Sequence, residues 1–369
     1  MKIAIFHNLD KGGGLIYLEK IAKTLKEKHT VDLYALNYNS DTTNFSKNYV
    51  FPISTTTGVI KHLHQVLFKL KEKNKIIAEL IDKNNYDLVI IGQCFLTQSP
   101  YLLKYLKNKN SLYLLHEPKR EFYENTSFDY YSFKRILTRL IRLPIKFIDI
   151  NNCQHARTII SNSYYSAKRI EEIYNKKSFV VYPGLKQIKP KLVIKKNNKK
   201  IISVGLFSKI KGHDFSVKQV SGLKSTYLKI IGRKTEEYKN ILKITQENDV
   251  ILESIFDAND KKKKEILSNS TFFLANQENE PFGVSTLEAV DGDCFVLGKN
   301  EGGTAEIISH GLNGFLYSNN IKIAQKALRY YLSQKYIKTY KTVKIDWKET
   351  TNKLLNIFQL IQCQSPSSS

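Results

Sequence analysis

The stretch EPFGVSTLE, Glu280 to Glu288, decides how this chain is interpreted. It follows an apolar run at Thr271–Ala275 that predicts a strand, and Gly283–Ser285 predicts the start of a helix. The unpaired N–H groups of a helix N-terminus suit a phosphate. Glu280 precedes the turn and Glu288 lies inside the helix, so both carboxylates can accept hydrogen bonds from sugar hydroxyls. Without the intervening Pro-Phe-Gly turn, two glutamates at this spacing would indicate a solvated helix face.

Two further motifs follow in order: EGGTAE at residues 301–306 and NGFL at residues 313–316. The combined pattern resembles the nucleotide-sugar half of GT-B glycosyltransferases, in particular the retaining family-4 group with its E-x7-E signature. This resemblance implies an α/β fold of two Rossmann-like domains that face a cleft, with a last helix that crosses back onto the first domain. It also implies sugar transfer from a nucleoside diphosphate, with retention of configuration and without a metal or other cofactor.

Composition limits the compartment and the partners. The four cysteines are scattered, which argues against zinc and against a disulfide framework and favours a reducing compartment. No signal-peptide core and no run of eighteen apolar residues is present, so a cytoplasmic or peripheral membrane protein is expected. The net charge of +24 is compatible with genome bias toward lysine, an anionic membrane surface or nucleic acid. No nucleic-acid-binding motif appears, so nucleic acid is not expected as a partner.

Apolar runs alternate with segments of helical period along the chain, which predicts parallel α/β structure. Residues 1–185 are expected to form a Rossmann-like acceptor domain and residues 186–345 a Rossmann-like nucleotide-sugar domain. Residues 346–362 are the returning helix and residues 363–369 a tail. The polar segment Lys186–Lys200, which contains Pro190, is the expected linker. Strands are predicted at eight further places: Lys2–Phe6, Val31–Leu36, Leu88–Ile91, Leu112–Leu115, Thr158–Ser161, Ile201–Val204, Tyr227–Ile231 and Val250–Leu252.

In the second domain, the resemblance implies that a cation after the first strand clamps the donor diphosphate. Lys211 matches the lysine of the family, whereas Leu206 stands where the family has an arginine. Lys209 is the nearest substitute, although a lysine cannot reproduce the bidentate fork of arginine. The resemblance assigns donor contacts to Phe282, Gly283 and Val284, ribose hydroxyls to Glu288 and sugar hydroxyls to Glu280. The alternative for Lys211 is an ordinary solvated lysine at a helix start.

In the first domain, His116-Glu117-Pro118-Lys119-Arg120 follows directly on a predicted strand. Open α/β sheets place ligands at the carboxyl ends of strands. The resemblance places His116 against the donor sugar or the acceptor, with Glu117 and Arg120 in the acceptor or sugar region. Gly13 and Gly14 let the backbone approach a phosphate, although the full G-x-G-x-x-G fingerprint is missing.

Two other features have competing interpretations. Asp291-Gly292-Asp293 has the D-x-D spacing of a metal site, but it follows a predicted helix, so we interpret it as a helix C-terminal turn. Lys134–Ile148 predicts an amphipathic helix with one basic stripe, formed by Arg135, Arg139, Arg142 and Lys146. Such a helix either lies on anionic lipid or packs on the core with a solvated outer face.

The sequence therefore predicts a retaining hexosyltransferase that acts on a glycan or lipid-linked acceptor. His116, Glu280 and Lys211 are its candidate catalytic residues, and an anionic membrane surface is a candidate partner. The alternative is a catalytically weak partner subunit that binds sugar nucleotides, which Leu206, Asp293 and Phe295 motivate.

Overall fold

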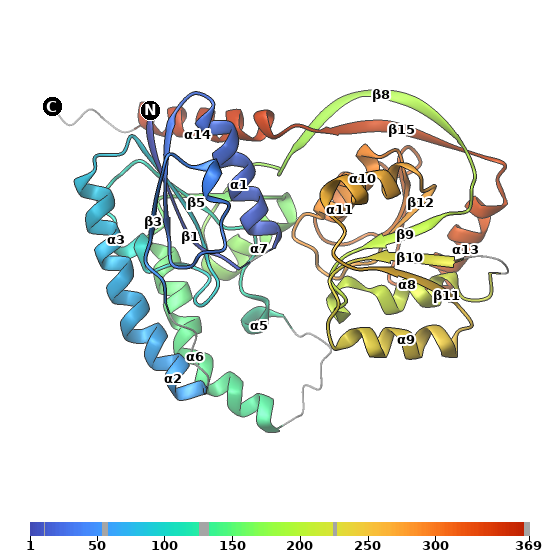
Figure 1. Ribbon diagram of the computed structural model, residues 1–369, viewed down its shortest axis with the longest axis horizontal. Helices are drawn as coiled ribbons and strands as arrows, with labels where there is room; N and C mark the ends of the chain where they lie inside the picture. Colours follow the sequence, from blue (N-terminus) through green and yellow to red (C-terminus); the bar gives the residue numbers. More distant parts are fainter. Residues whose placement is uncertain (11, 54–57, 125–132, 224–226, 365–369) are drawn as a thin grey trace. The chain divides into compact units, whose positions relative to one another are not determined.

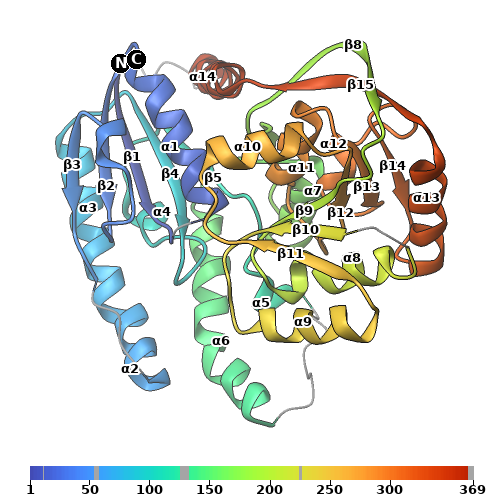
Figure 2. The same cartoon turned by 45° about the vertical axis from the view of Figure 1, so that its right-hand side comes forward.

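The computed structural model describes residues 1–10, 12–53, 58–124, 133–223 and 227–364 (Figure 1). The chain folds into two compact units. Unit 1 comprises Met1–Pro183 and Trp347–Ser369, and unit 2 comprises Gly184–Asp346. In each unit, helices lie on both faces of a parallel sheet (Figures 1 and 2).

The sheet of unit 1 has the strand order β3-β2-β1-β4-β5-β6-β7, and neighbouring strands are parallel. The order reverses between β1 and β4, which is the topological switch point of a Rossmann-like sheet. The strands are β1 (Lys2–Asn8), β2 (Thr30–Ala35), β3 (Lys47–Val50), β4 (Leu88–Cys94), β5 (Ser111–Leu114), β6 (Thr158–Ser161) and β7 (Phe179–Val180).

Because strand residues alternate between faces, β1 contributes to two separate cores. Ala4 and Phe6 pack on one face, and Ile3 and Ile5 pack on the other. The helices around this sheet are α1 (Gly13–Lys26), α2 (Val59–His64), α3 (Lys71–Lys83), α4 (Leu102–Tyr105), α5 (Arg120–Tyr123), α6 (Phe133–Gln154), α7 (Tyr164–Tyr174) and α14 (Trp347–Gln364). A π-helical turn at Gln65–Leu70 joins α2 to α3. The predicted last helix is α14, and it packs beside α1 through Leu354 and Phe358.

The predicted amphipathic helix is α6, which continues through Pro144. The side chains of Arg135 and Arg139 lie outside the described residues. Arg142 forms an ion pair of 2.8 Å with Glu121, and the Lys146 ammonium lies 4.9 Å from the centre of the Tyr123 ring. The two described members of the basic stripe therefore contact other parts of unit 1.

Unit 2 repeats the topology with the order β11-β10-β9-β12-β13-β14, again parallel. The strands are β9 (Ile201–Val204), β10 (Tyr227–Ile231), β11 (Ile251–Ile255), β12 (Phe272–Ala275), β13 (Phe295–Lys299) and β14 (Gly314–Tyr317). The helices are α8 (His213–Val220), α9 (Glu237–Glu247), α10 (Asp260–Ser268), α11 (Val284–Asp291), α12 (Thr304–Ile307) and α13 (Ile321–Ser333). The switch point lies between β9 and β12, directly before the Lys211 loop and the Glu280 loop.

The prediction of a linker at Lys186–Lys200 is wrong for most of this segment. Its first part belongs to strand β8 (Leu185–Lys196), which pairs antiparallel with β15 (Tyr336–Ile345). The register shifts between Lys341 and Val343, and Pro190 stands opposite this irregularity. Proline is tolerated in a strand at an edge or a bulge, which is why Pro190 does not end β8.

The interpretation of Asp291-Gly292-Asp293 as a helix C-terminal turn agrees with the structure. Helix α11 ends at Asp291, and Asp293 has a left-handed backbone with a φ of 60°. Lys341 donates to the Asp291 carbonyl at 2.7 Å and lies 3.6 Å from each of the two carboxylates. A lysine at this place also complements the helix dipole.

Within the residues that the structure describes, no helix is both long enough and apolar enough to span a membrane.

Candidate functional site

The donor half of the candidate site lies at the carboxyl ends of β9 and β12. After β9, a short 3-10 turn at Lys209–Lys211 ends at Gly212, whose φ is 63°. A Cβ on Gly212 would lie 2.0 Å from the Asn276 carbonyl oxygen, so only glycine lets this loop approach the loop after β12. The Glu278 N–H then donates to the Ile210 carbonyl at 2.9 Å. These contacts fix the two loops against each other.

Lys211 and Glu280 meet at this junction. The Lys211 Nζ donates to the Glu280 Oε2 at 2.6 Å, and both side chains are only partly exposed. The structure thus brings together the two candidate catalytic residues of unit 2. Lys209 is exposed, and Leu206 lies on the same loop with partial exposure.

Helix α11 begins directly after this junction. Gly283 is its N-cap with a φ of 94°, and a Cβ there would lie 2.5 Å from the Thr304 Oγ1. Phe282 is buried beneath the turn. A Cβ on Gly303 would meet the Pro281 carbonyl oxygen at 2.2 Å, so the Gly-Gly pair of the EGGTAE motif supports the backbone before α11.

Three buried polar atoms surround the first turn of α11 without a hydrogen-bond partner in the described part of the chain: the Gln277 Oε1, the Thr286 Oγ1 and the Thr304 Oγ1. Gln277 reaches this turn through a 3.4 Å contact with the Ser285 hydroxyl. Buried polar atoms are nearly always paired, so an unpaired group points to a ligand or an ordered solvent molecule. The two threonine hydroxyls are fully buried, so the first N–H groups of α11 are the groups that suit the oxygens of an anion.

Glu288 lies further along α11 and pairs with Lys263 of α10 at 2.7 Å. The Lys263 ammonium also lies 3.5 Å from Asp260. Burial lowers the pKa of Lys263, but the Glu288 carboxylate outweighs it and the pKa is raised overall, so the pair is ionised at neutral pH. The sequence did not identify Lys263, because four consecutive lysines at 261–264 hide the one that faces α11.

In unit 1, the structure brings together His116, Gly14 and Tyr17. His116 follows β5, and a Cβ on Gly14 would lie 3.9 Å from the His116 Cδ2. The Tyr17 ring packs edge-on against the imidazole, with the ring centres 4.5 Å apart. Gly13 begins α1, and a Cβ there would meet nothing within 4 Å. The His116 Nδ1 and the Tyr17 hydroxyl are buried without a partner among the described residues.

Glu117 and Arg120 form an ion pair with each other. The Arg120 Nε donates to the Glu117 Oε2 at 2.7 Å, and the Glu117 carbonyl accepts from Gln93 and Gln98. Lys119 donates to the carbonyls of Phe95 and Leu96 at 2.8 and 3.0 Å. The segment from His116 to Arg120 is thereby fastened to the loop that follows β4.

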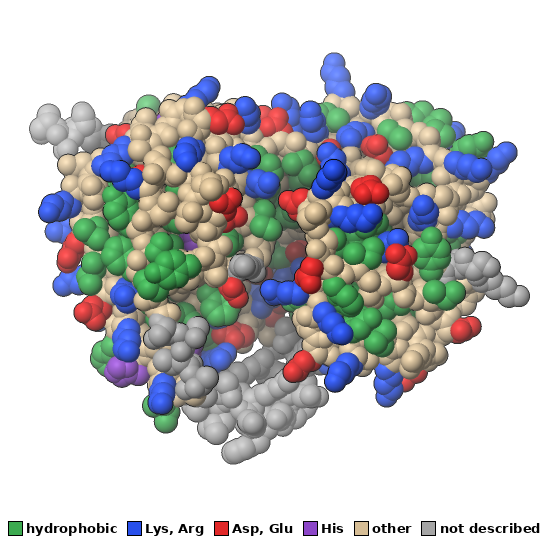
Figure 3. Space-filling view, in the orientation of Figure 1, with side chains coloured by type: hydrophobic (Ala, Val, Ile, Leu, Met, Phe, Trp, Pro, Cys, Tyr) green, Lys and Arg blue, Asp and Glu red, His purple; other side chains and the backbone are tan. Residues whose placement is uncertain are grey.

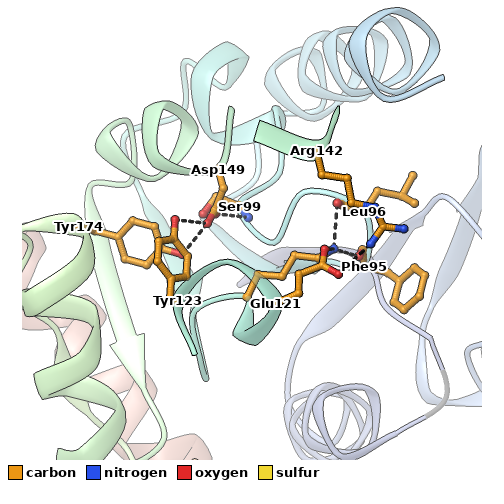
Figure 4. A network of polar contacts seen from close by, with 9 residues as sticks. Phe95, Leu96, Ser99, Glu121, Tyr123, Arg142, Asp149 and Tyr174 are labelled. Atoms are coloured by element: carbon orange, nitrogen blue, oxygen red, sulfur yellow. Dashed lines mark hydrogen bonds and ion pairs between the residues drawn. The ribbon is translucent and has the colours of Figure 1, made fainter. Parts of the chain in front are cut away.

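Helix α5 continues this segment and is fastened to α6. Figure 4 shows the Tyr123 and Tyr174 hydroxyls pointing at the buried Asp149 carboxylate, at 3.2 and 2.7 Å. The Ser99 N–H donates to the other oxygen of Asp149 at 3.0 Å. Burial raises the pKa of Asp149, and the three donors oppose that shift. This network holds the candidate acceptor segment in place from its far end.

Burial lowers the pKa of His116 from 6.5 to about 4, so its imidazole is neutral at pH 7. The unfolded chain then binds a proton that the folded chain excludes, and stability falls as the pH drops from about 6.5 to about 4. The free energy of unfolding of the wild type decreases between pH 7 and pH 5. We expect this decrease to be smaller by about 1–2 kcal/mol in His116→Gln. Chemical denaturation at the two pH values measures this, and an unchanged pH dependence would show that folding does not lower the pKa of His116.

Among the described residues, no cluster of three or more His, Cys, Asp or Glu side chains is placed to hold a metal ion. Metal-free transfer remains a prediction from the resemblance.

Comparison with known proteins finds similarity to glycosyltransferases. Residues 185–346 match the family described as Glycosyl transferases group 1. The human alpha-1,3/1,6-mannosyltransferase ALG2 is 26% identical over 241 residues, which cover 57% of this chain and 56% of that protein. The corresponding protein of Schizosaccharomyces pombe is 25% identical over 287 residues, 65% of this chain and 54% of the relative. The chain thus spans about half the length of the curated relatives it matches.

Solved structures share the fold across the whole chain. Sucrose-phosphate synthase from Thermosynechococcus elongatus superposes with a TM-score of 0.71 at 13% identity, over 99% of this chain and 100% of that one. Anabaena HepE in complex with UDP-glucose gives a TM-score of 0.63 at 14% identity, over 98% and 100% of the two chains. The fold is therefore GT-B, as the resemblance carried by the EPFGVSTLE, EGGTAE and NGFL motifs implied.

Proposed function

We propose that this chain, whose residues 185–346 match the family described as Glycosyl transferases group 1, is a hexosyltransferase that uses a nucleoside diphosphate sugar. The acceptor is a hydroxyl of a cell-surface glycan or of a lipid-linked saccharide, and configuration is retained. The relatives named above are mannosyltransferases, which favours a mannosyl donor as the first to test.

The observation that carries this proposal is the 2.6 Å contact between Lys211 and Glu280 beside the N-terminus of α11. In a sugar nucleotide, the transferred sugar is bonded directly to the β-phosphate. A cation for the phosphate and a carboxylate for sugar hydroxyls must then lie next to each other, as these two do. The first N–H groups of α11 supply further polar partners for the diphosphate.

In the proposed mechanism, Lys211 and the first N–H groups of α11 stabilise the negative charge that builds on the leaving diphosphate. The bond between the anomeric carbon and the phosphate oxygen breaks, and the acceptor oxygen bonds to the same face of the sugar. The acceptor proton passes to the β-phosphate oxygen. Glu280 orients the sugar and Glu288 the ribose, while neutral His116 supplies a hydrogen bond to the sugar or acceptor.

The mechanism assigns no step to a metal ion. The partners are the sugar nucleotide, the glycan or lipid-linked acceptor and an anionic membrane surface, which suits a protein that is peripheral on the cytoplasmic side of a membrane.

Thermal denaturation with GDP-mannose, UDP-sugars and ADP-sugars tests donor binding. A ligand that binds only the folded protein stabilises it by about 2.7 kcal/mol at one hundred times its Kd. We expect one nucleotide class to raise Tm and the other two to leave it unchanged. If no class raises Tm, the chain does not bind these sugar nucleotides, and the proposed function is wrong.

Turnover separates the enzyme from a partner subunit that only binds sugar nucleotides. We expect the purified protein to transfer sugar to a lipid-linked acceptor or, more slowly, to hydrolyse the donor. A Tm shift without transfer or hydrolysis would favour the partner subunit, which the leucine at position 206 motivates.

A further inference from the structure

Strands β8 and β15 form an unusually basic two-stranded ribbon in unit 2. Neither strand contains an acidic residue, and together they carry eight lysines: Lys186, Lys189, Lys191, Lys195, Lys196, Lys338, Lys341 and Lys344. Figure 3 shows Lys and Arg side chains along the edge of unit 2 where Figure 1 places β8 and β15, with hydrophobic side chains between them. This concentration of charge is not explained by the donor site.

The register divides the ribbon into two faces. Along β8, Val193 and Lys195 point to one face, and they lie opposite Thr339 and Ile337. Ile337 and Thr339 are buried, and β15 packs against α11. Lys195 donates to the Ser268 and Gly292 carbonyls at 3.2 and 3.1 Å. This face is therefore the inner one, and Lys195 and Lys341 fasten it to unit 2.

The outer face combines lysines with large apolar side chains. On β8, Ile194 is 57% exposed and Leu192 is 45% exposed, and Lys196 follows on the same face. On β15, Lys338 lies opposite Ile194, and Tyr340 lies opposite Leu192. Tyr336 lies opposite Lys196 and is 51% exposed. Each exposed apolar side chain thus lies beside or opposite a lysine or a tyrosine.

Five lysines of the ribbon are exposed and make no ion pair with any described residue: Lys189, Lys191, Lys196, Lys338 and Lys344. A row of lysines on an edge ribbon also prevents pairing with other strands, but that role does not need exposed isoleucine and leucine beside them. Aliphatic and tyrosine side chains among lysines match the interface of an anionic bilayer, where the apolar groups enter below the headgroups. Nucleic acid would instead favour arginine, which neither strand contains.

We propose that the outer face of the β8–β15 ribbon binds an anionic membrane surface. The proposal rests on the proposed function only in that a lipid-linked acceptor gives the protein a reason to reach the membrane. It places the contact on unit 2, whereas the basic stripe predicted from the sequence lies on α6 of unit 1, where Arg142 is already paired with Glu121.

Flotation of the full chain with vesicles tests the proposal. We expect binding to vesicles of phosphatidylcholine with phosphatidylglycerol, no binding to phosphatidylcholine alone, and release at high salt. Lys196→Glu/Lys338→Glu should lower partitioning at least about thirty-fold, since each lysine near an anionic surface contributes about 1 kcal/mol and 1.4 kcal/mol is tenfold. Lys189→Glu/Lys344→Glu should lower it in the same way, and Leu192→Ser/Ile194→Ser should weaken binding at every salt concentration.

The matched control is Lys239→Glu/Lys243→Glu on α9, which lies on the other side of unit 2 from the ribbon (Figures 1 and 2) and changes the net charge equally. We expect this control to stay within about twofold of the wild type. Equal loss in the control, or binding abolished by Arg142→Glu/Lys146→Glu but not by the ribbon variants, would overturn the proposal. Retention on RNA without retention on vesicles would also overturn it.

The Tm shift with the sugar nucleotide is measured on the same variants. The ribbon variants should keep this shift, because the substituted residues are not among those that form the donor site. A wild-type chain that shows the Tm shift but never floats refutes the membrane surface and leaves the proposed function standing. A chain that floats but shows no Tm shift supports the membrane surface and refutes the proposed function.

Discussion

Lys211→Ala should lower the rate of sugar transfer by about 10²–10³, the usual effect of removing one preorganised donor from a charge that develops in the transition state. The Lys211 ammonium is held at 2.6 Å by Glu280, on a loop fixed by Gly212 against Asn276. This positioning means that Lys211 does not reorganise when the diphosphate leaves. Single-turnover kinetics with saturating donor measures the effect directly.

The substitutions around Lys211 separate its role from that of its neighbours. Lys209 is exposed, so Lys209→Ala should cost little, and Lys211→Arg should keep part of the activity because charge is retained. Leu206→Arg should raise kcat, since it restores the second cation that the family resemblance implies. If Lys209→Ala proves as damaging as Lys211→Ala, Lys209 is the substitute cation. If neither lysine matters, the phosphate binds elsewhere.

Much of the fold could be predicted from the sequence because buried parallel strands are short apolar runs. The runs at Leu88–Ile91 and Ile201–Val204 are strands β4 and β9, since a strand covered on both faces contains few polar residues. The Pro-Phe-Gly turn predicted the start of α11 within one residue. Gly283 has a left-handed backbone, and Gly303 packs closely against the Pro281 carbonyl, so each of the two motifs needs glycine at its position.

The β8–β15 ribbon could not be predicted in the same way. Its two strands are separated by well over a hundred residues, and their lysines give each the composition of a linker. Only pairing with the distant strand turns the alternation at Leu192, Ile194 and Lys196 into one outer face. Long-range pairing of this kind leaves no local signal in hydrophobic periodicity.

In the candidate site, too, some residues could be predicted from local sequence motifs and others could not. The glutamates and Lys211 could be nominated from the sequence, because the family resemblance rests on motifs with fixed spacing around glycine and proline turns. Gln277 and Lys263 were not found, because their relation to α11 depends on how neighbouring strands and helices pack. The partners of Glu117 and Arg120 were also not foreseen, although they are only three residues apart.

Glu288→Ala should weaken donor binding by about 1.5–3 kcal/mol, the range for a hydrogen bond to a charged group, with the fold intact. Calorimetric titration with the nucleotide diphosphate measures this loss. Glu288 already accepts from Lys263 at 2.7 Å, so one of its oxygens is oriented before the ribose arrives. Preorganisation of this kind lets the ribose hydroxyls bind without further ordering of the side chain.

Lys263→Met is the matched variant, because it removes the same ion pair but keeps the carboxylate. The pair is partly exposed, and such pairs contribute about 1 kcal/mol or less to stability, so both variants should fold. If Glu288 binds the ribose itself, Lys263→Met should cost much less affinity than Glu288→Ala. A 2′-deoxynucleotide should then bind the wild type less tightly than the ribonucleotide does. Glu288→Ala should bind the two nucleotides with equal affinity. Equal losses in the two variants would mean that Glu288 serves only to hold Lys263, and the ribose would then have to be bound by the lysine.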